Sequence, residues 1–343
     1  MFLETDMTAR SIIRQLAMHS CENITDHLDR GSFSALPLCR GGFGDVYHGN
    51  LTSGLRVAVK IPQISLNILE ENPGYLKDVA REVHTWSKCN HPNVLQFLGL
   101  AELRGQIGMV APWMEYGSLP RYVEKALSVD RCKLCAQICE GVAYLHHIGI
   151  VHGDLKGENV LISGDSVAVI SDFGGSLLKN RSLNIVPLEK GLCLTYQWAA
   201  PELLLQGGIG EAVESNDLTS IETWMSQTGA KCALNTRESD IYALGMTILE
   251  IISGRLPWYW IRNEPAIIMH VCSPGKPHKR PRQISVYSPG GDKLWKLLNE
   301  CWSYNSGVRP TAIEVGNVME AMTPGDLKAY PPPILGNRCV IFY

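Results

Sequence analysis

One short stretch of the sequence gathers residues that can handle protons, phosphates and metal ions. Residues 152–159 are HGDLKGEN, and this stretch contains Asp154, Lys156 and Asn159. A carboxylate can accept or orient a hydroxyl proton, an ammonium can stabilise phosphate oxygens, and an amide oxygen is a hard ligand suited to Mg²⁺. Taken alone, Asp154 is equally well explained as a turn residue, because Asp favours turns.

A second acidic position follows a short apolar run. Asp172 lies in residues 171–174, SDFG. Its carboxylate oxygens would also suit Mg²⁺. The plain alternative is an acidic residue at the end of a loop.

A glycine-rich stretch precedes these positions by about a hundred residues. Residues 39–46 are CRGGFGDV, with Gly41, Gly42 and Gly44. Without a Cβ atom, such a hairpin lets backbone N–H groups approach phosphate oxygens. Glycines in a tight turn are the simpler explanation if nothing else supports a phosphate site.

One lysine ends an otherwise apolar run. Lys60 closes residues 57–60, VAVK, and is expected on a strand. A partly buried lysine requires an anionic partner, because an unpaired buried ammonium loses its proton. Glu82, on a predicted helix, can supply one carboxylate and a phosphate the other. The alternative is a lysine at a strand end that extends into water.

The elements that must position these residues differ between the two halves of the chain. The first half is rich in strand patterns and has one helix, predicted over 75–90, with Leu76, Val79, Val83 and Trp86 at helical spacing. It therefore predicts a small, mostly antiparallel β-lobe. The strands are predicted over 35–38, 43–49, 55–62, 91–102 and 106–114.

The second half has helical periodicity. Helices are predicted over 134–149, 239–254 and 292–302, so this half predicts a helical lobe. Residues 206–235 are polar and rich in Gly, Ser and Thr, which favours a long surface loop, with a partner-binding insert as the alternative. The end, 324–343, contains three consecutive prolines and predicts an extended tail.

Composition narrows the classes of function. The chain has 343 residues, 45% of them hydrophobic and 19% charged, which is typical of a globular protein. A net charge of −3 gives no electrostatic reason to expect nucleic acid or an anionic membrane as a main partner. The eleven cysteines are scattered, which favours reduced thiols. Without a visible signal peptide or membrane span, we expect a cytoplasmic protein without membrane insertion.

In this order and at these separations, the motifs resemble the protein-kinase superfamily over residues 36–323. The resemblance implies an α+β, bilobal fold, with a small antiparallel β-sheet N-lobe that carries one main helix and a mostly helical C-lobe. The domain is expected over 23–323, between an arm at 1–22 and the tail at 324–343. Its N-lobe is expected over about 30–112 and its C-lobe over about 116–323.

The resemblance also assigns roles to individual residues. It implies ATP as the phosphoryl donor and Mg²⁺, or Mn²⁺, as the metal, with protein substrates. Lys60 would hold the α- and β-phosphates with Glu82 as its partner, Asp154 would position the substrate hydroxyl, and Lys156 would stabilise the γ-phosphate. The metal ligands would be Asn159 and Asp172. The remaining nucleotide-site residues would be Gly41, Gly42, Gly44, Val46, Ala58, Pro112, Met114 and Leu161, with Ala111 as gatekeeper.

Three supporting contacts follow from the same resemblance. Asp240 would hydrogen-bond the backbone of the catalytic loop, and Glu202 would form an ion pair with Arg309. Thr195 would bridge Asp154 and Lys156. The side chains expected to form a core stack rather than to take part in the chemistry are His152, Phe173, Trp86 and Phe97.

The sequence departs from the pattern of the superfamily at three places. Gly153 replaces an Arg that pairs with a phosphorylated activation segment, so regulation through that contact is not expected. Cys39 replaces the first glycine of the phosphate loop, and the insert at 206–235 lengthens the route to Asp240. Gly153 leaves the chemistry untouched, which favours a differently regulated enzyme over an inactive one.

The class of kinase follows from several residues. Lys156 and Thr195 resemble serine/threonine kinases, whereas Trp198 in WAAPE resembles tyrosine and tyrosine-kinase-like enzymes. The combination resembles the tyrosine-kinase-like serine/threonine group, and the HGD motif in place of HRD is similar to kinases of mushroom-forming fungi. The alternatives are a non-catalytic pseudokinase that serves as a binding module and a dual-specificity or tyrosine kinase. Oligomeric state and pathway stay open.

Overall fold

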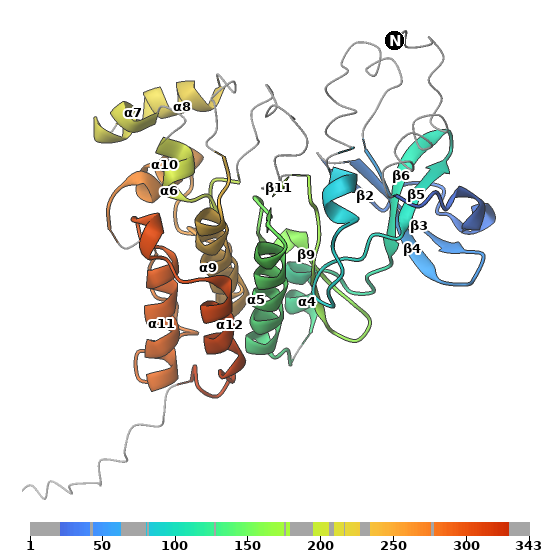
Figure 1. Cartoon of the computed structure of the whole chain (residues 1–343). Helices are drawn as coiled ribbons and strands as arrows, with labels where there is room; N and C mark the ends of the chain where they lie inside the picture. The colour runs from blue at the N-terminus through green and yellow to red at the C-terminus, as the bar shows by residue number, and fades with distance from the viewer. Residues whose placement is uncertain are drawn as a thin grey trace, which may run out of the picture.

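The protein has two lobes of different secondary structure (Figure 1). A β-sheet lobe formed by the first third of the chain lies beside a larger lobe that is mostly helical. This arrangement confirms the predicted α+β, bilobal fold. The computed structural model describes residues 21–41, 44–62, 80, 82–126, 128–174, 176–178, 195–205, 209–215, 217–226, 234–275 and 278–328.

The N-lobe is built on one antiparallel sheet. Its strand order is β1-β3-β4-β6-β5, and β2 pairs with β3 as a hairpin. The strands are β1 (Leu28–Asp29), β2 (Cys39–Gly41), β3 (Gly44–Leu51), β4 (Arg56–Ile61), β5 (Gly99–Leu103) and β6 (Gln106–Pro112).

The side chains of strand β4 alternate between a buried face of the sheet and the opposite face. Val57, Val59 and Ile61 are buried on one face, while Ala58 and Lys60 point to the other because side chains alternate along a strand. The buried face is covered by Ile24, Leu28 and Phe33, which form a separate apolar cluster with it. The sheet thus directs Lys60 away from the face that this apolar cluster covers.

Two strand predictions are wrong in part. Residues 35–38 form no strand, and the hairpin begins at Cys39. Within the predicted strand 91–102, only the end from Gly99 is extended and paired in β5. Pro37 and Pro92 account for part of this, because proline has no N–H to donate to a sheet.

The predicted helix at 75–90 is described only near its end. Residues 82–86 are helical, and Val83 and Trp86 are buried on one side as the spacing predicts. Leu76 and Val79 lie outside the described residues.

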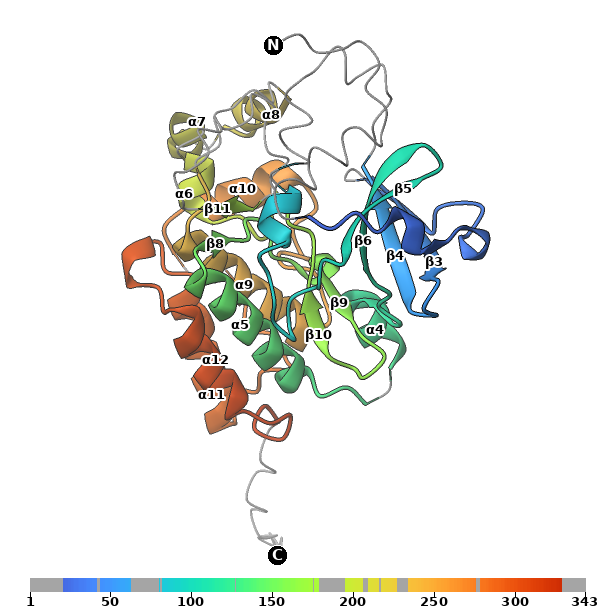
Figure 2. The ribbon, with the colours of Figure 1, turned by 45° about the vertical axis from the view of Figure 1, so that its right-hand side comes forward.

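The C-lobe is organised around α9 (Arg237–Ser253), which lies among the other helices of this lobe (Figure 2). Its residues from Ser239 to Ser253 are all buried. A capping box at Thr236 fixes its start and Gly254 ends it in the left-handed conformation. Besides α9, the lobe contains α4 (Leu119–Lys125), α5 (Arg131–His147), α10 (Glu264–Cys272), α11 (Pro289–Cys301) and α12 (Ala312–Glu320). The three helices predicted from the sequence correspond to α5, α9 and α11.

Short paired strands anchor the loops that contain several of the predicted site residues. The first group is β7 (Gly117–Ser118), β9 (Val160–Ile162) and β10 (Ala168–Ile170), and the second is β8 (Ile150–Val151) with β11 (Leu177–Leu178). β8 leads into residues 152–159, and β10 leads into Asp172. Both stretches are therefore anchored by paired strands.

The prediction of a loop at 206–235 is wrong for its described part. It contains α7 (Gly210–Glu214) and α8 (Leu218–Ser226), which follow α6 (Pro201–Leu204) and pack against α10. Asp217 accepts hydrogen bonds from the first amides of α8. Ile221 is fully buried beneath it. An N-terminal acceptor and apolar residues at helical spacing stabilise this helix in a polar segment.

The described residues also bear on the predictions about cysteines and membrane spans. Every cysteine that the structure describes is a free thiol, and all of these except Cys39 are buried, as the prediction of reduced thiols requires. Within the same described ranges, none of the helices combines the length and apolar character needed to span a bilayer.

Candidate active site

Lys60 forms ion pairs with two carboxylates. Its Nζ atom lies 2.8 Å from Oε1 of Glu82 and 3.1 Å from Oδ1 of Asp172. Burial alone would lower the pKa of Lys60, but the two carboxylates outweigh it and raise that pKa above its ordinary value. The predicted pair with Glu82 is confirmed, and Lys60 stays charged.

Asp172 occupies a strained position at the end of β10. Its φ angle is +66°, a left-handed conformation that is uncommon outside glycine, although Asp tolerates it better than most residues. Burial would raise the pKa of Asp172, but Lys60 overrides this effect and lowers it. The carboxylate is therefore ionised and fixed on one oxygen by Lys60.

Asp154 lies at the centre of a polar network. Nζ of Lys156 donates to Oδ2 of Asp154 at 2.7 Å, and the hydroxyl of Thr195 donates to Oδ1 at 2.9 Å. Lys156 also donates to the Thr195 hydroxyl at 3.0 Å. The predicted bridge by Thr195 is confirmed, and it brings the activation segment to the catalytic loop.

Asn159 joins this network to the second acidic position. Its Nδ2 donates to the backbone oxygen of Asp154 at 2.7 Å and to Oδ2 of the same residue at 2.8 Å. The amide and hydroxyl of Ser171, the residue before Asp172, both donate to the backbone oxygen of Asn159. The two stretches that the sequence separates are therefore directly bonded.

The donor set suits a hard divalent cation. Both hydrogen bonds of the Asn159 side chain use its nitrogen, so its amide oxygen lies outside them. At Asp172, Oδ1 accepts from Lys60 and from the amide of Gly174, which leaves Oδ2 outside those bonds. Carboxylate and amide oxygens are the ligands that Mg²⁺ prefers.

The phosphate loop is described at its two ends. Gly41 pairs with Gly44 across the hairpin, while Gly42 lies outside the described residues. Gly44 has a φ of +130°, and a Cβ atom there would lie 2.3 Å from the carbonyl oxygen of Ile61. The backbone therefore requires glycine at this position.

The residues expected around adenine lie on neighbouring elements. Val46 pairs with Lys60 and Ala58 pairs with Ala111 in adjacent strands. Val46, Ala58 and Leu161 are half-buried. Pro112 ends β6, where it pairs with Val57, and the amide of Gly117 donates to the carbonyl of Met114 at 3.1 Å.

Asp240 and a stack of aromatic rings contact the catalytic loop. Asp240 accepts hydrogen bonds from the amides of His152 and Gly153 at 2.8 and 2.9 Å, as predicted. The ring of Phe173 lies 5.6 Å from that of His152 and 6.0 Å from that of Trp86, and Phe97 follows at 5.2 Å from Trp86. The predicted stack is confirmed.

The predicted ion pair between Glu202 and Arg309 is bidentate. Nη1 and Nη2 of Arg309 lie 2.6 and 2.8 Å from the two carboxylate oxygens. The arginine side chain is fully buried and also donates to the carbonyls of Glu238 and Ser303. It ties the end of the activation segment to the helical lobe.

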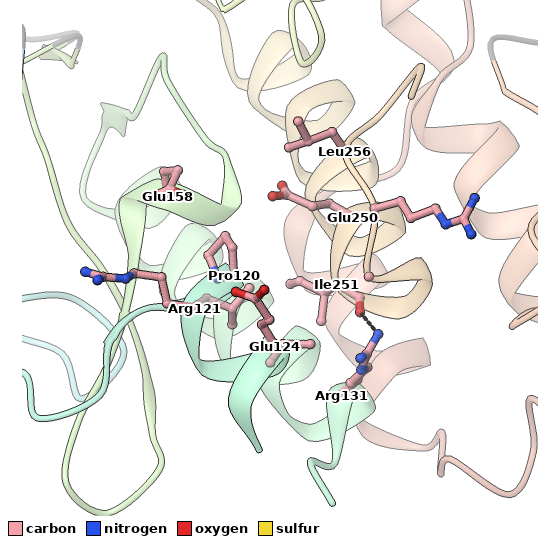
Figure 3. Close-up of a pocket in the computed structure, with 12 residues that line it drawn as sticks. Pro120, Arg121, Glu124, Arg131, Glu158, Glu250, Ile251 and Leu256 are labelled. Carbon is pink, nitrogen blue, oxygen red and sulfur yellow. Dashed lines mark hydrogen bonds between the residues drawn. The ribbon is translucent and has the colours of Figure 1, made fainter. Parts of the chain in front are cut away.

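One buried carboxylate beside the catalytic loop, Glu250, was not predicted from the sequence. Glu250 accepts hydrogen bonds from the amide of Gly157 and from Nε1 of Trp198, and burial raises its pKa to about 7. It lines a cavity of about 380 Å³ with Glu124 and Glu158 (Figure 3). A glutamate within the apolar run of a predicted helix is the only signal the sequence offers.

The sequence is similar to a known protein family and to individual proteins of that family. Residues 35–319 match the family described as protein tyrosine and serine/threonine kinase. Mitogen-activated protein kinase kinase kinase 2 of Arabidopsis thaliana is 28% identical over 282 residues, which cover 80% of this chain and 38% of that protein. MAP kinase kinase kinase SSK2 of Saccharomyces cerevisiae is 29% identical over 288 residues, covering 80% and 18%.

A probable serine/threonine-protein kinase of Dictyostelium discoideum is 30% identical over 281 residues, covering 80% of this chain and 48% of that protein. The chain thus spans less than half the length of each of these three relatives. The family match extends over most of the chain and includes every residue named in the candidate active site. The chain belongs to the family of protein tyrosine and serine/threonine kinases.

Proposed function

We propose that this chain is an active serine/threonine protein kinase that transfers the γ-phosphoryl group of ATP to hydroxyl groups of protein substrates. The observation that carries the proposal is the set of contacts that hold two charged residues, Lys60 and Asp154. Lys60 is paired with Glu82 and Asp172, while Asp154 is held by Lys156, Thr195 and Asn159. Phosphoryl transfer depends mainly on such positioning and charge stabilisation.

In the proposed reaction each residue has one task. The substrate hydroxyl donates a hydrogen bond to Asp154, and its oxygen forms a new bond to the γ-phosphorus as the bond to the ADP oxygen breaks. The hydroxyl proton passes to Asp154. Lys156 stabilises the transferred oxygens, and Lys60 holds the phosphates that remain on ADP.

Asn159 and Asp172 would hold Mg²⁺, or Mn²⁺, through their oxygen atoms. The metal, when bound, supplies positive charge that neutralises phosphate oxygens. Around the nucleotide, Gly41, Gly42 and Gly44 would approach the phosphates. The adenine would lie among Val46, Ala58, Pro112, Met114 and Leu161.

The choice of serine and threonine rests on two residues. Lys156 and Thr195 contact each other and Asp154, a combination that resembles serine/threonine enzymes. The printed names of two relatives also describe kinases that act on other kinases, and one describes a serine/threonine kinase. We assign the chain to the tyrosine-kinase-like group, in the cytoplasm, with a domain at 23–323.

Regulation would differ from that of kinases with Arg at position 153. Gly153 offers no guanidinium to a phosphorylated activation segment. Ser176 and Ser182 are the hydroxyl groups that phosphorylation could modify near this position. Ser176 is buried and donates to the carbonyl of His152 at 3.1 Å, while Ser182 lies outside the described residues. The insert at 206–235 would instead contact a regulatory partner.

The test is transfer of labelled γ-phosphate from Mg-ATP to a generic Ser/Thr protein substrate. Asp154→Ala and Lys60→Met should each lower the rate at least about 100-fold, because they remove positioning and charge stabilisation of the reacting groups. Asp165→Ala and Lys133→Met change exposed residues of the same types and should leave the rate unchanged. Thermal unfolding would establish that all variants are folded.

If the folded wild type transfers no more phosphate than Asp154→Ala, the proposed activity is wrong. The chain would then be a non-catalytic member of its family that uses the fold for binding. Transfer to tyrosine in place of serine and threonine would instead overturn the assigned specificity alone.

A further inference from the structure

Gly153, the residue before Asp154, is held at its amide by α9 and at its carbonyl by Asn235, which lies two residues before that helix. The amide of Gly153 donates to Oδ1 of Asp240 at 2.9 Å. The carbonyl oxygen of the same glycine accepts a hydrogen bond from Nδ2 of Asn235 at 3.3 Å. The contact with Asp240 was expected, whereas the contact with Asn235 had no counterpart in the sequence analysis. Together they fix the two peptide groups that flank Gly153.

Gly153 is a residue that needs such fixing. Its φ angle is +81°, and glycine populates both signs of φ with similar ease. It has no side chain with which to anchor itself. A rotation at Gly153 would directly reorient Asp154, the next residue of the chain. Hydrogen bonds to its amide and its carbonyl therefore take over a restraint that glycine cannot supply.

Asn235 is itself rigidly presented. Only 7% of its surface is exposed. The next residue, Thr236, forms the capping box of α9 with Ser239, through bonds of 3.1 and 2.9 Å. A side chain beside such a cap has little freedom, so its amide can hold a neighbouring loop in place.

The contact also lies close to the reacting residue. Asn235, Gly153, Asp154 and Thr195 line one cavity of about 20 Å³. A space of this size accommodates about one water molecule among polar atoms. Asn235 and Asp154 therefore border the same small space.

We propose that Asn235 is a positioning residue, which holds the catalytic loop at Gly153 and thereby the orientation of Asp154. The inference rests on the proposed function for its kinetic part. It gives the insert at 206–235 a part in catalysis, because its last residue bonds to the catalytic loop. Asn235 acts through the backbone of Gly153 and touches no substrate.

The test uses the full chain and three variants. Asn235→Leu keeps the approximate shape and removes the hydrogen-bond donor, Asn235→Ala removes the side chain, and Leu234→Ala is the control at a neighbour that is 58% exposed. The two Asn235 variants should lower kcat about 5- to 30-fold, which corresponds to the loss of one hydrogen bond. KM for ATP should change less than about twofold, because the contact restrains Asp154 rather than the nucleotide site.

Hydrogen–deuterium exchange gives a second measurement that needs no activity. Peptides covering 150–157 should exchange faster in both Asn235 variants and at the wild-type rate in Leu234→Ala, since only the former release the loop. If Asn235→Leu fails to fold, Asn235→Asp keeps the shape and also removes the donor.

The outcomes separate the two proposals. Unchanged kcat together with unchanged exchange in the Asn235 variants overturns the positioning role. A fall in stability alone, with kcat and loop exchange as in the wild type, overturns it as well. If the wild type itself transfers no phosphate, the proposed activity has failed, and exchange at 150–157 alone decides the role of Asn235.

Discussion

At the scale of single residues, Thr195 connects the two charged groups of the catalytic loop. Its hydroxyl donates to Asp154 and accepts from Lys156. One hydroxyl therefore fixes the distance between a carboxylate and an ammonium that would otherwise contact each other alone. The activation segment reaches the reacting groups through this one side chain.

We expect Thr195→Val to lower kcat about 10- to 100-fold with little change in KM for ATP, because it keeps the shape and loses the hydroxyl that orients Asp154. Thr195→Ser keeps the hydroxyl and should remain within about threefold of the wild type. Steady-state kinetics on the three proteins measure this. Equal activity of the Val and Ser variants would show that the bridge has no catalytic role.

A contact can be predicted from the sequence where a residue requires a partner of opposite charge. A lysine on an apolar strand must be paired, and Glu82 was the available carboxylate, so that contact could be predicted. Asn235 offered no such demand. An asparagine at the end of a polar segment has many ordinary uses, and its partner is a backbone oxygen, which exists at every position of the chain. Glu250, within an apolar run, does require a partner, but the backbone amide of Gly157 and the indole N–H of Trp198 are donors that the sequence does not single out.

At the scale of elements, α9 connects the parts of the site. Asp240 from its first turn holds the catalytic loop, Glu250 from its last turns holds Gly157 and Trp198, and the carbonyl of Glu238 accepts from Arg309. One buried helix thus contacts the catalytic loop, Trp198 of the activation segment and Arg309.

Arg309→Ala should lower the free energy of unfolding by about 3–5 kcal/mol, because it leaves Glu202 without its partner in a mostly buried position. Arg309→Lys should recover only part of this loss, since an ammonium cannot form the bidentate contact. Urea unfolding measures both, with the exposed Arg262→Ala as the control. A loss below about 1 kcal/mol in Arg309→Ala would contradict a structural role for the pair.

Long helices were predicted, and a short one in a polar segment was not. The helices α5, α9 and α11 span 13 to 17 residues and were found where expected. In contrast, α8 lies in a polar segment and depends on a cap at Asp217 and on Ile221 packing below it. The stretch predicted as a strand at 35–38 lies beside β3, where the amide of Leu38 donates to the carbonyl of Val46, but Pro37 has no N–H with which to extend the ladder.

At the scale of the whole molecule, stability should depend on the protonation of Glu250. The pKa of Glu250 is raised by burial from 4.5 to about 7. Between these values the folded state keeps a proton that the unfolded chain has released. Raising the pH through this window therefore removes stability.

The Glu250→Gln variant isolates this effect. Both hydrogen bonds reach one oxygen, Oε2, so the amide oxygen of glutamine can accept them. The stability of the wild type relative to the variant should fall by about 2–3 kcal/mol between pH 5 and about pH 7.5. Chemical denaturation at several pH values measures it, with the exposed Glu320→Gln as the control. A difference independent of pH would show that Glu250 titrates normally.

The covering of the sheet by Ile24, Leu28 and Phe33 has a consequence for how the protein can be shortened. The family match begins at residue 35, which is downstream of all three side chains. A recombinant fragment cut at that boundary would expose Val57, Val59 and the apolar side chains packed beside them. Such an uncovered sheet face favours aggregation. A fragment that keeps this cover must therefore begin upstream of the family boundary and include Ile24.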